Sequence, residues 1–332
     1  MKMINLAQFG AGRIGAVHAE NIAANESTNL KWVVDVFEES ATKLADAHGA
    51  KASTDPGEAL SDPDVQGIII ASSTDTHLDL ILEGVKAGKA VFCEKPIDLD
   101  LNRVDGKLKE IQSQNVPVLI GFNRRYDPNF KAVHDAIENG SIGDLEMVKI
   151  TSRDPSPPPI EYINVSGGLF RDMMIHDLDL ARWLLGEEPV EVYASASCLV
   201  DEAIGEAGDV DTAIVTMKTE SGKLCQIDNS RRAVYGYDQR MEVFGSNGMV
   251  KADNVQTNTV EIWDADHVRR EKPPFFFLER YANAYRAELA HFVDVMDGKS
   301  APAVTVQDGR QALALANAAL ASSQSGRAET PS

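Results

Sequence analysis

Residues 4–22, INLAQFGAGRIGAVHAENI, decide the fold of the first part of the chain. The stretch begins as a short apolar strand and ends with the spacing of a helix. Between the two stands a G-x-G-x-x-G pattern. In it Gly10 permits a tight turn, Gly12 leaves the backbone open to a pyrophosphate, and Gly15 allows close helix packing. Because the pattern follows a strand and opens a helix, it predicts a dinucleotide-binding turn.

A second apolar strand, LKWVVD, ends at Asp35, twenty residues after the last of these glycines. A carboxylate at this position accepts hydrogen bonds from ribose hydroxyls and repels a 2′-phosphate. Val36 and Phe37 offer no arginine that would neutralise such a phosphate. The sequence therefore predicts NAD rather than NADP, with Arg13 and Ile14 of the turn in the same binding site. The alternative, in which the glycines serve only the geometry of the turn, stays open.

Strands and helices alternate up to residue 121. Further strands are expected at 67–71, 90–93 and 117–121, and helices at 39–49, 75–88 and 99–114. Since the strands are apolar almost throughout, the pattern predicts a parallel sheet covered by helices on both faces. We expect an α/β domain with a Rossmann fold over residues 1–122.

After residue 122 the pattern changes to that of an open, mainly antiparallel sheet. Strands are expected at 145–152, 190–199, 213–218, 223–230, 239–244 and 248–252, and late helices at 278–296 and 306–322. The proline-rich run at 155–159, PSPPP, predicts a stiff loop. We expect an α+β domain over residues 123–332 that binds substrate and mediates oligomerisation.

The stretch GGLFRDMMIHDLDLARW, residues 167–183, is mostly apolar yet carries a narrow polar line. On one α-helix Asp172, His176, Asp179 and Trp183 would project to the same side. An exposed i, i+4 pair between Asp172 and His176 is one interpretation. The other is that the line forms one wall of a polar cleft, and the helix alone does not decide between them.

The composition of the chain argues against several kinds of binding partner. The chain has 332 residues and a net charge of −19, from 51 acidic and 32 basic residues, which would repel nucleic acid and anionic membranes. It contains no apolar run of ~20 residues and no signal-peptide pattern, so we expect a cytoplasmic protein. Cys93, Cys198 and Cys225 lack C-x-x-C spacing, and the histidines do not cluster with them, so we expect neither a disulfide framework nor a metal site.

The tripeptide Glu94-Lys95-Pro96 follows a predicted strand. Together with the glycine-rich turn and a D-x-x-x-H helix after a proline-rich loop, it resembles the Gfo/Idh/MocA oxidoreductase family. The resemblance runs from GAGRIGAVHAEN to ERYANAYRAELAHFVDVM, and residues 152–194 are especially similar to the inositol 2-dehydrogenase branch. It implies NAD-dependent oxidation of myo-inositol or scyllo-inositol to the 2-keto compound, and a homotetramer.

The resemblance also implies roles for single residues. Lys95 matches the active-site lysine, Asp172 the catalytic acidic residue and His176 the general base. Tyr281 is equally open to a role in packing, and we expect His18 to be structural. The expected cofactor site comprises Gly10, Gly12, Arg13, Ile14, Gly15, Asp35, Ser72, Thr74, His77, Glu94 and Lys95, and the expected substrate site Asn123, Arg153, Asp154, Asp172, His176 and Tyr281.

Ser152 and Asp154 differ from the residues of other branch members, so the resemblance does not fix the choice of substrate. Elementary chemistry agrees with the assigned roles. Oxidation of a secondary alcohol needs a base of near-neutral pKa, which a histidine supplies, and a cation that stabilises negative charge on the oxygen. Three alternatives stay open: a pyranose (aldose) dehydrogenase, an NAD-dependent glycoside hydrolase, and a non-catalytic NAD-binding protein.

Overall fold

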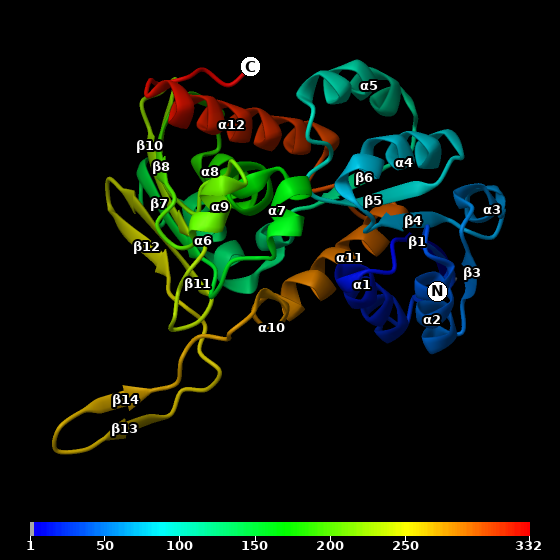
Figure 1. The fold of residues 1–332 in the computed structure, drawn as a ribbon, viewed down its shortest axis with the longest axis horizontal. Coiled ribbons are helices and arrows are strands. Elements are labelled where there is room, and N and C mark those ends of the chain that lie inside the picture. The colour runs from blue at the N-terminus through cyan, green and yellow to red at the C-terminus, as the bar shows by residue number, and fades with distance from the viewer. Residues whose placement is uncertain (1–2) are drawn as a thin grey trace. The chain divides into compact units, whose positions relative to one another are not determined.

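The computed structural model describes residues 3–332, which divide into two compact units. Unit 1 combines the described residues up to Tyr126 with Ala284–Leu313, and unit 2 combines Asp127–Asn283 with Ala314–Ser332 (Figure 1). The chain therefore leaves unit 1, builds most of unit 2, returns to unit 1 and ends in unit 2. Within the described residues, no helix has both the length and the apolar character needed to cross a membrane.

Unit 1 contains a six-stranded sheet in which every neighbouring pair is parallel. The strand order is β3-β2-β1-β4-β5-β6, which is the order of a Rossmann fold and confirms that prediction. The order reverses between β1 and β4, so ligands are expected at the carboxyl ends of these strands. The strands are β1 (Ile4–Phe9), β2 (Thr28–Val34), β3 (Lys51–Ser53), β4 (Gly67–Ile70), β5 (Ala90–Glu94) and β6 (Val118–Gly121).

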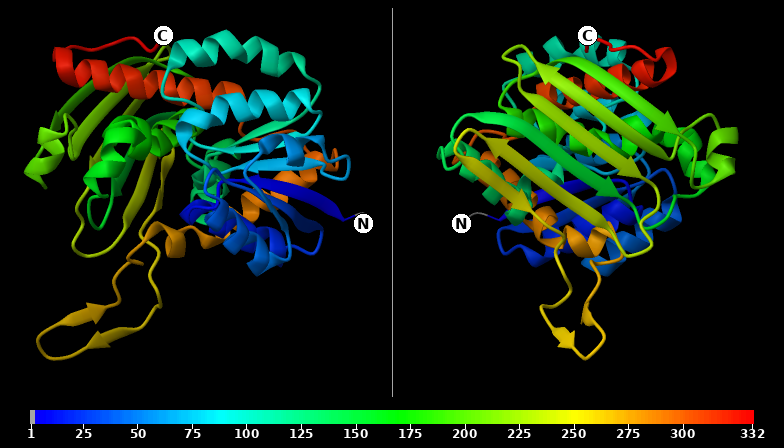
Figure 2. Two further views of the ribbon diagram at one scale, coloured as in Figure 1. Left: turned by 45° about the vertical axis from the view of Figure 1, so that its right-hand side comes forward. Right: turned by 90° about the vertical axis from the view of Figure 1, so that its left-hand side faces the viewer.

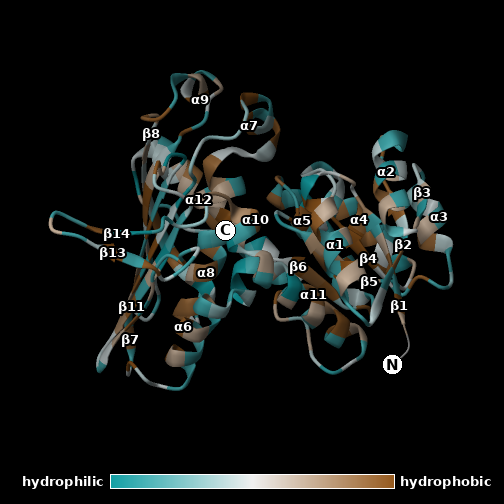
Figure 3. Ribbon diagram, turned by 90° about the horizontal axis from the view of Figure 1, so that it is seen from below, coloured by the Kyte–Doolittle hydropathy of each residue, from teal (hydrophilic) through white to brown (hydrophobic). Residues whose placement is uncertain are grey.

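Helices cover both faces of this sheet. The strands β4, β5 and β6 are buried along their whole length, and the hydropathy colouring of Figure 3 shows β4 and β5 as largely apolar. The sequence did not predict β3 or the helix after it, because a strand of three residues and a helix of six carry too little periodic signal. The helices are α1 (Arg13–Ala24), α2 (Glu38–His48), α3 (Pro56–Ser61), α4 (Thr74–Lys86) and α5 (Leu101–Ser113), followed by the 3₁₀ turn η1 (Asn123–Tyr126).

Helix α11 (Ala282–Met296) belongs to unit 1 for all but its first two residues, although it lies far along the chain. Leu289, Phe292 and Val293 join the same apolar core as Leu6 and Ile22. We had expected this segment within a second domain over residues 123–332. The apolar stripe of a helix shows that it packs against something, but it does not identify the partner.

Unit 2 contains a second six-stranded sheet, in the order β12-β11-β7-β10-β9-β8. β7 and β10 are parallel and the other neighbours antiparallel, which confirms the prediction of a mainly antiparallel sheet. The right-hand view of Figure 2 looks onto the strands, with helices behind them. The strands are β7 (Leu145–Arg153), β8 (Pro189–Ser197), β9 (Thr212–Thr219), β10 (Leu224–Ser230), β11 (Asp238–Gly245) and β12 (Gly248–Ala252).

Alternating side chains divide this sheet into two faces. In β7, Val148 and Ile150 are buried, whereas Met147 and Lys149 are exposed. The buried face carries α6 (Pro128–Glu138) and α8 (Ile175–Leu185), and Asn229 of β10 donates to Asp177 of α8 at 3.0 Å. The other face, called the open face below, exposes Met147, Tyr193, Ile214, Leu224, Phe244 and Met249.

Several short elements complete unit 2. They are α7 (Ile160–Ser166), the π-turn η2 (Leu169–Met173), α9 (Glu202–Glu206), β13 (Glu261–Trp263), β14 (Val268–Arg270) and α10 (Phe277–Arg280), and α12 (Val306–Ser325) ends here. The β13–β14 hairpin stands away from the rest of the unit (Figures 1 and 2). Its Ile262, Trp263 and Val268 are exposed.

A buried ion pair joins the two ends of the long segment of unit 2. Arg280, at the end of α10, pairs with Asp127, and both side chains are 2% exposed. Asp127 also caps α6, since its Oδ1 accepts from the backbone N–H groups of Asn129 at 3.0 Å and Phe130 at 3.2 Å. Both charges can be buried because their mutual attraction offsets the cost of removing each of them from water.

Candidate functional site

The glycine-rich turn after β1 has the geometry expected of a dinucleotide site. A Cβ atom at Gly10 would lie 2.4 Å from the carbonyl oxygen of Ala71, and one at Gly15 would lie 2.2 Å from the carbonyl oxygen of Gly10. A Cβ at Gly12 would meet nothing within 4 Å, so open space lies beside the first turn of α1. N–H groups at a helix N-terminus bordering open space fit the pyrophosphate of NAD.

Asp35 follows β2 and lies against this turn. Its Oδ2 accepts from the backbone N–H of Ala11 at 2.7 Å, and its Oδ1 accepts from that of Phe37 at 2.9 Å. Both hydrogen bonds hold the carboxylate beside the glycines, and the side chain stays partly exposed. Within unit 1, Asp35 and the turn are thus brought together as predicted, while Arg13 is exposed at the start of α1 and Ile14 is half-buried.

His77 was expected to contact the cofactor, but its side chain is 2% exposed. One ring nitrogen lies 2.8 Å from the carbonyl oxygen of Pro96, and the other lies 3.1 Å from that of Ser72. Burial lowers the pKa of His77 below its ordinary value. The ring therefore ties the loop after β4 to the loop after β5, whereas Ser72 and Thr74 remain partly exposed at the sheet's carboxyl end.

Glu94-Lys95-Pro96 lies where β5 ends, as the sequence predicted. Lys95 is half-buried, and its neighbours Glu94 and Pro96 are buried. The Glu94 carboxylate, expected among the cofactor ligands, instead turns inward and lies 2.7 Å from Nε2 of His18 in α1. Asn123, in η1 after β6, is 3% exposed. Of these residues, Lys95 is the most exposed.

In unit 2 the predicted single helix over residues 167–183 is wrong in one respect. Leu169 to Met173 form a π-turn, in which the N–H of Met174 donates to the carbonyl of Leu169 at 2.8 Å, and α8 begins only at Ile175. A π-turn holds one more residue than an α-turn, so it offsets Asp172 from the line of α8. Such turns are frequent at functional sites.

The π-turn is held at its start by Asp209. The N–H of Leu169 donates to the two oxygens of Asp209 at 3.1 and 3.0 Å. Gly168 has φ +77°, and a Cβ there would lie 2.5 Å from an Asp209 oxygen, so only glycine fits. Asp209 lies in a loop before β9 and gave no sequence signal, since loop aspartates are common.

Asp172 and His176 are both half-buried, the first on the π-turn and the second in the first turn of α8. The hydroxyl of Tyr162 in α7 donates to Oδ1 of Asp172 at 3.0 Å. Sequence reasoning missed Tyr162 because the proline-rich run before it predicted only a loop. The segment IEYINVS after the prolines was too short to predict as a helix.

The rest of the expected polar line serves packing. Asp179 is 1% exposed, and its Oδ1 lies 3.7 Å from the guanidinium of Arg182. The ring of Trp183 stacks on that of His134 in α6, with centroids 4.0 Å apart. The polar line is therefore short, and its partly exposed acidic and basic groups are Asp172 and His176.

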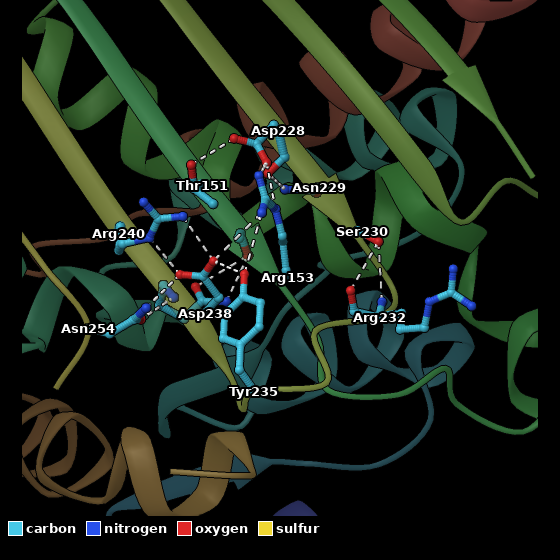
Figure 4. A network of polar contacts seen from close by, with 12 residues as sticks. Thr151, Arg153, Asp228, Asn229, Ser230, Arg232, Tyr235, Asp238, Arg240 and Asn254 are labelled. Carbon is cyan, nitrogen blue, oxygen red and sulfur yellow. Dashed lines mark hydrogen bonds and ion pairs between the residues drawn. The ribbon is translucent and has the colours of Figure 1, made fainter. Parts of the chain in front are cut away.

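The structure does not bring Arg153 to His176, which corrects the expectation that both line one site. β7 extends through Arg153, and the alternation of the strand directs its side chain to the open face (Figure 4). There its Nε donates to Oδ1 of Asp228 at 2.8 Å, and its Nη1 lies 3.4 Å from the Tyr235 hydroxyl. Helix α8 covers the opposite face. Asp154, one residue later, is partly exposed.

Two further residues of interest are internal to unit 2. Tyr281 is 2% exposed, and its hydroxyl lies 3.1 Å from Oε1 of Gln239, so the structure favours its packing role. Ser152 is fully buried and lies 2.9 Å from Nε2 of Gln239. Ser152, which differs from the residues of other branch members, thus makes a hydrogen bond inside unit 2.

The expected catalytic set is divided between the two units. Lys95 belongs to unit 1, and Asp172 and His176 belong to unit 2. Lys95 follows the carboxyl end of the parallel strand β5, Asp172 stands on η2, and His176 stands in the first turn of α8.

Comparison with known proteins covers both units. Residues 4–122 match the model of the oxidoreductase family with an NAD-binding Rossmann fold, and residues 130–251 match that of the GFO/IDH/MocA C-terminal domain. The myo-inositol 2-dehydrogenase of Thermotoga maritima is 49% identical over 312 residues, which are 94% of this chain and 93% of that protein.

Two solved structures extend the similarity. The myo-inositol dehydrogenase of Corynebacterium glutamicum has a TM-score of 0.95 and 46% identity, covering 99% of each chain. The scyllo-inositol dehydrogenase of Lactobacillus casei, with bound NAD(H) and scyllo-inositol, has a TM-score of 0.93 and 28% identity, again covering 99% of each. The two family models and these relatives agree over nearly the whole length, and the chain belongs to the Gfo/Idh/MocA family of NAD-binding oxidoreductases.

Proposed function

We propose that the protein is an NAD-dependent inositol 2-dehydrogenase, which oxidises one ring hydroxyl of myo-inositol or scyllo-inositol to the 2-keto compound. The observation that carries the proposal is the 49% identity, over 94% of the chain, to a myo-inositol 2-dehydrogenase. The glycine-rich turn with Asp35, and the half-buried Lys95, Asp172 and His176, support it independently.

The proposed reaction needs a base, an anion-stabilising group and a hydride acceptor. The nicotinamide of NAD, when bound, supplies the hydride acceptor. His176 takes the proton of the reacting hydroxyl, since an imidazole is half-protonated near neutral pH. Lys95 stabilises the negative charge that grows on that oxygen. Asp172, on the preceding turn, stabilises the imidazolium that forms at His176.

Tyr162 adds a residue to this proposal. Its hydroxyl donates to Asp172 at 3.0 Å, so one carboxylate oxygen is already oriented by the protein. A carboxylate held by a hydrogen bond keeps one position while its charge acts on His176. Tyr162 thus serves as a positioning residue for Asp172.

The proposed homotetramer has support in unit 2. The open face exposes Met147, Phe244 and four other large apolar side chains, and the hairpin exposes Trp263. Exposed apolar patches of this kind on one sheet face favour self-association. Since each sheet has one such face, a copy of the same chain is the proposed partner.

The substrate assignment is tested by initial rates of NADH formation with a panel of cyclitols and aldoses. We expect turnover with myo-inositol or scyllo-inositol and NAD, and much lower rates with NADP. Preferential oxidation of an aldose would replace the proposal with a pyranose dehydrogenase. Glycoside cleavage without net NADH would indicate the hydrolytic alternative.

The roles of Lys95 and His176 are tested by Lys95→Ala and His176→Ala. Loss of a positioned acid or base should lower kcat about 10²-fold or more, while NAD binding by fluorescence titration is kept. Lys43→Ala, on the exposed side of α2, is the control and should leave kcat unchanged. Wild-type kcat in both site variants would reject the assigned site.

Cofactor choice is tested by the double variant Asp35→Ala, Val36→Arg. It removes the ribose acceptor and adds a cation for a 2′-phosphate, so the ratio of NAD to NADP affinity should fall by about tenfold or more. Val36→Arg alone keeps the carboxylate and should still favour NAD. An unchanged ratio in the double variant would contradict the role of Asp35.

Assembly through the open face is tested by Phe244→Asp, which places a charge among its apolar side chains. Sedimentation velocity should give the mass of four chains for the wild type and a smaller species for the variant. Val36→Asp, at an exposed residue of unit 1, is the control. A tetramer of unchanged stability in Phe244→Asp would exclude this face.

A further inference from the structure

Three ionisable side chains from distant parts of the sequence meet inside unit 1. His18 comes from α1, Glu94 from the end of β5, and Glu288 from α11. Their exposed fractions are 1%, 9% and 0%. One nitrogen or carboxylate oxygen from each lies within 4.8 Å of the others. The proposed chemistry uses none of the three, so their burial together needs another explanation.

Some polar atoms of this group have a hydrogen-bond partner and others have none assigned. Nε2 of His18 lies 2.7 Å from Oε1 of Glu94, and the rings of Phe92 and Tyr285 stand edge-on to the imidazole, with centroids 5.1 and 5.9 Å away. Among the residues that the structure describes, neither oxygen of Glu288 has a hydrogen-bond partner, and neither does Nδ1 of His18. The cluster thus holds an enclosed acid with no donor assigned to it.

An ionised carboxylate in this position would be costly. It would lack a hydrogen-bond donor, and it would lie beside a second carboxylate in a medium of low dielectric constant. Burial, followed by the charge of Glu94, raises the pKa of Glu288 well above its ordinary value. His18 of α1 also faces Glu288, and the ring of Tyr285, on the same helix as Glu288, stands edge-on to that imidazole. Protonation of Glu288 removes the repulsion from Glu94 and the need for a donor, because a neutral carboxyl group carries no charge and can itself donate a hydrogen bond.

We propose that Glu288 carries a proton in the folded protein and completes, with His18 and Glu94, a buried group that positions the end of β5. Glu94 directly precedes Lys95, so the contacts that fix its side chain also fix the backbone carrying the ammonium group. Its Oε2 lies against β6, where a Cβ added to Gly121 would be 3.3 Å away.

Pro96, on the other side of Lys95, is held through its carbonyl oxygen by His77. Lys95 therefore stands between two residues that buried side chains secure from different elements. Misplacement of a reacting group by about 1 Å can cost about 10²-fold in rate, so this double attachment has a direct use. The positioning role rests on the proposed function, whereas the protonation of Glu288 does not.

Infrared spectroscopy of protein with isotope-labelled glutamate tests the proton directly. The wild type at pH 7 should show the C=O band of a buried carboxylic acid, and Glu288→Gln should lack it. A wild type without that band overturns the assignment. So would one equivalent of a tightly bound divalent metal ion that Glu288→Gln loses, since a metal would hold Glu288 ionised.

Kinetics of two variants test the positioning role. Glu288→Gln keeps the shape of the neutral acid, so kcat should stay close to that of the wild type. Glu288→Ala opens the cluster, and kcat per folded molecule should fall by about 10- to 100-fold. Leu289→Ala, at the next buried position of α11, is the control for a cavity outside the cluster. It should lower the melting temperature and leave kcat unchanged.

The outcomes are separable. Equal kcat in Glu288→Ala and Leu289→Ala would reject positioning even if the infrared band is present. A wild type inactive on every polyol would reject the proposed function, but it would leave the infrared result to decide the protonation of Glu288. NAD affinity by titration supplies a further readout, and we expect Glu288→Ala to change kcat more than the dissociation constant of NAD.

Discussion

The attachment of the carboxyl end of β5 is the constraint on which the proposed site depends. Glu94 and Pro96 are buried, and each contacts a histidine from another element, His18 and His77 respectively. Buried polar groups must be satisfied, so these contacts cannot be given up without a large loss of stability. Lys95 lies between them, directly after β5. The backbone that carries the flexible side chain of Lys95 is thereby held in one position, as a site for proton and hydride transfer requires.

In unit 2 an irregular backbone segment positions the acidic residue of the proposed site. Asp172 stands on a π-turn, which Asp209 holds at its start and which leads directly into α8. Tyr162 then fixes one oxygen of the carboxylate. The π-turn separates two tasks: an irregular segment carries the carboxylate, and a regular helix carries His176. Strain or irregularity of this kind is usually kept only where it has a use.

The choice among ring epimers depends on which hydroxyls find polar partners. One relative is a myo-inositol dehydrogenase and another a scyllo-inositol dehydrogenase, and both share this fold over 99% of its length. The fold therefore does not select the epimer. Of the two residues that depart from the branch pattern, Ser152 is enclosed and bonded to Gln239, whereas Asp154 is partly exposed. Asp154 is accordingly the better candidate for a contact with substrate.

The sequence by itself determined the Rossmann order, the glycine-rich turn with Asp35, and the position of Lys95 at a strand end. These follow from local patterns, because strand periodicity and glycine spacing act over a few residues. Only the tertiary structure decided that α11 completes the core of unit 1, that Glu288 meets Glu94, and that Arg153 faces away from α8. These facts depend on which surfaces pack together and on where a strand ends. Because β7 continues through Arg153, the alternation of the strand sets the face to which that side chain points.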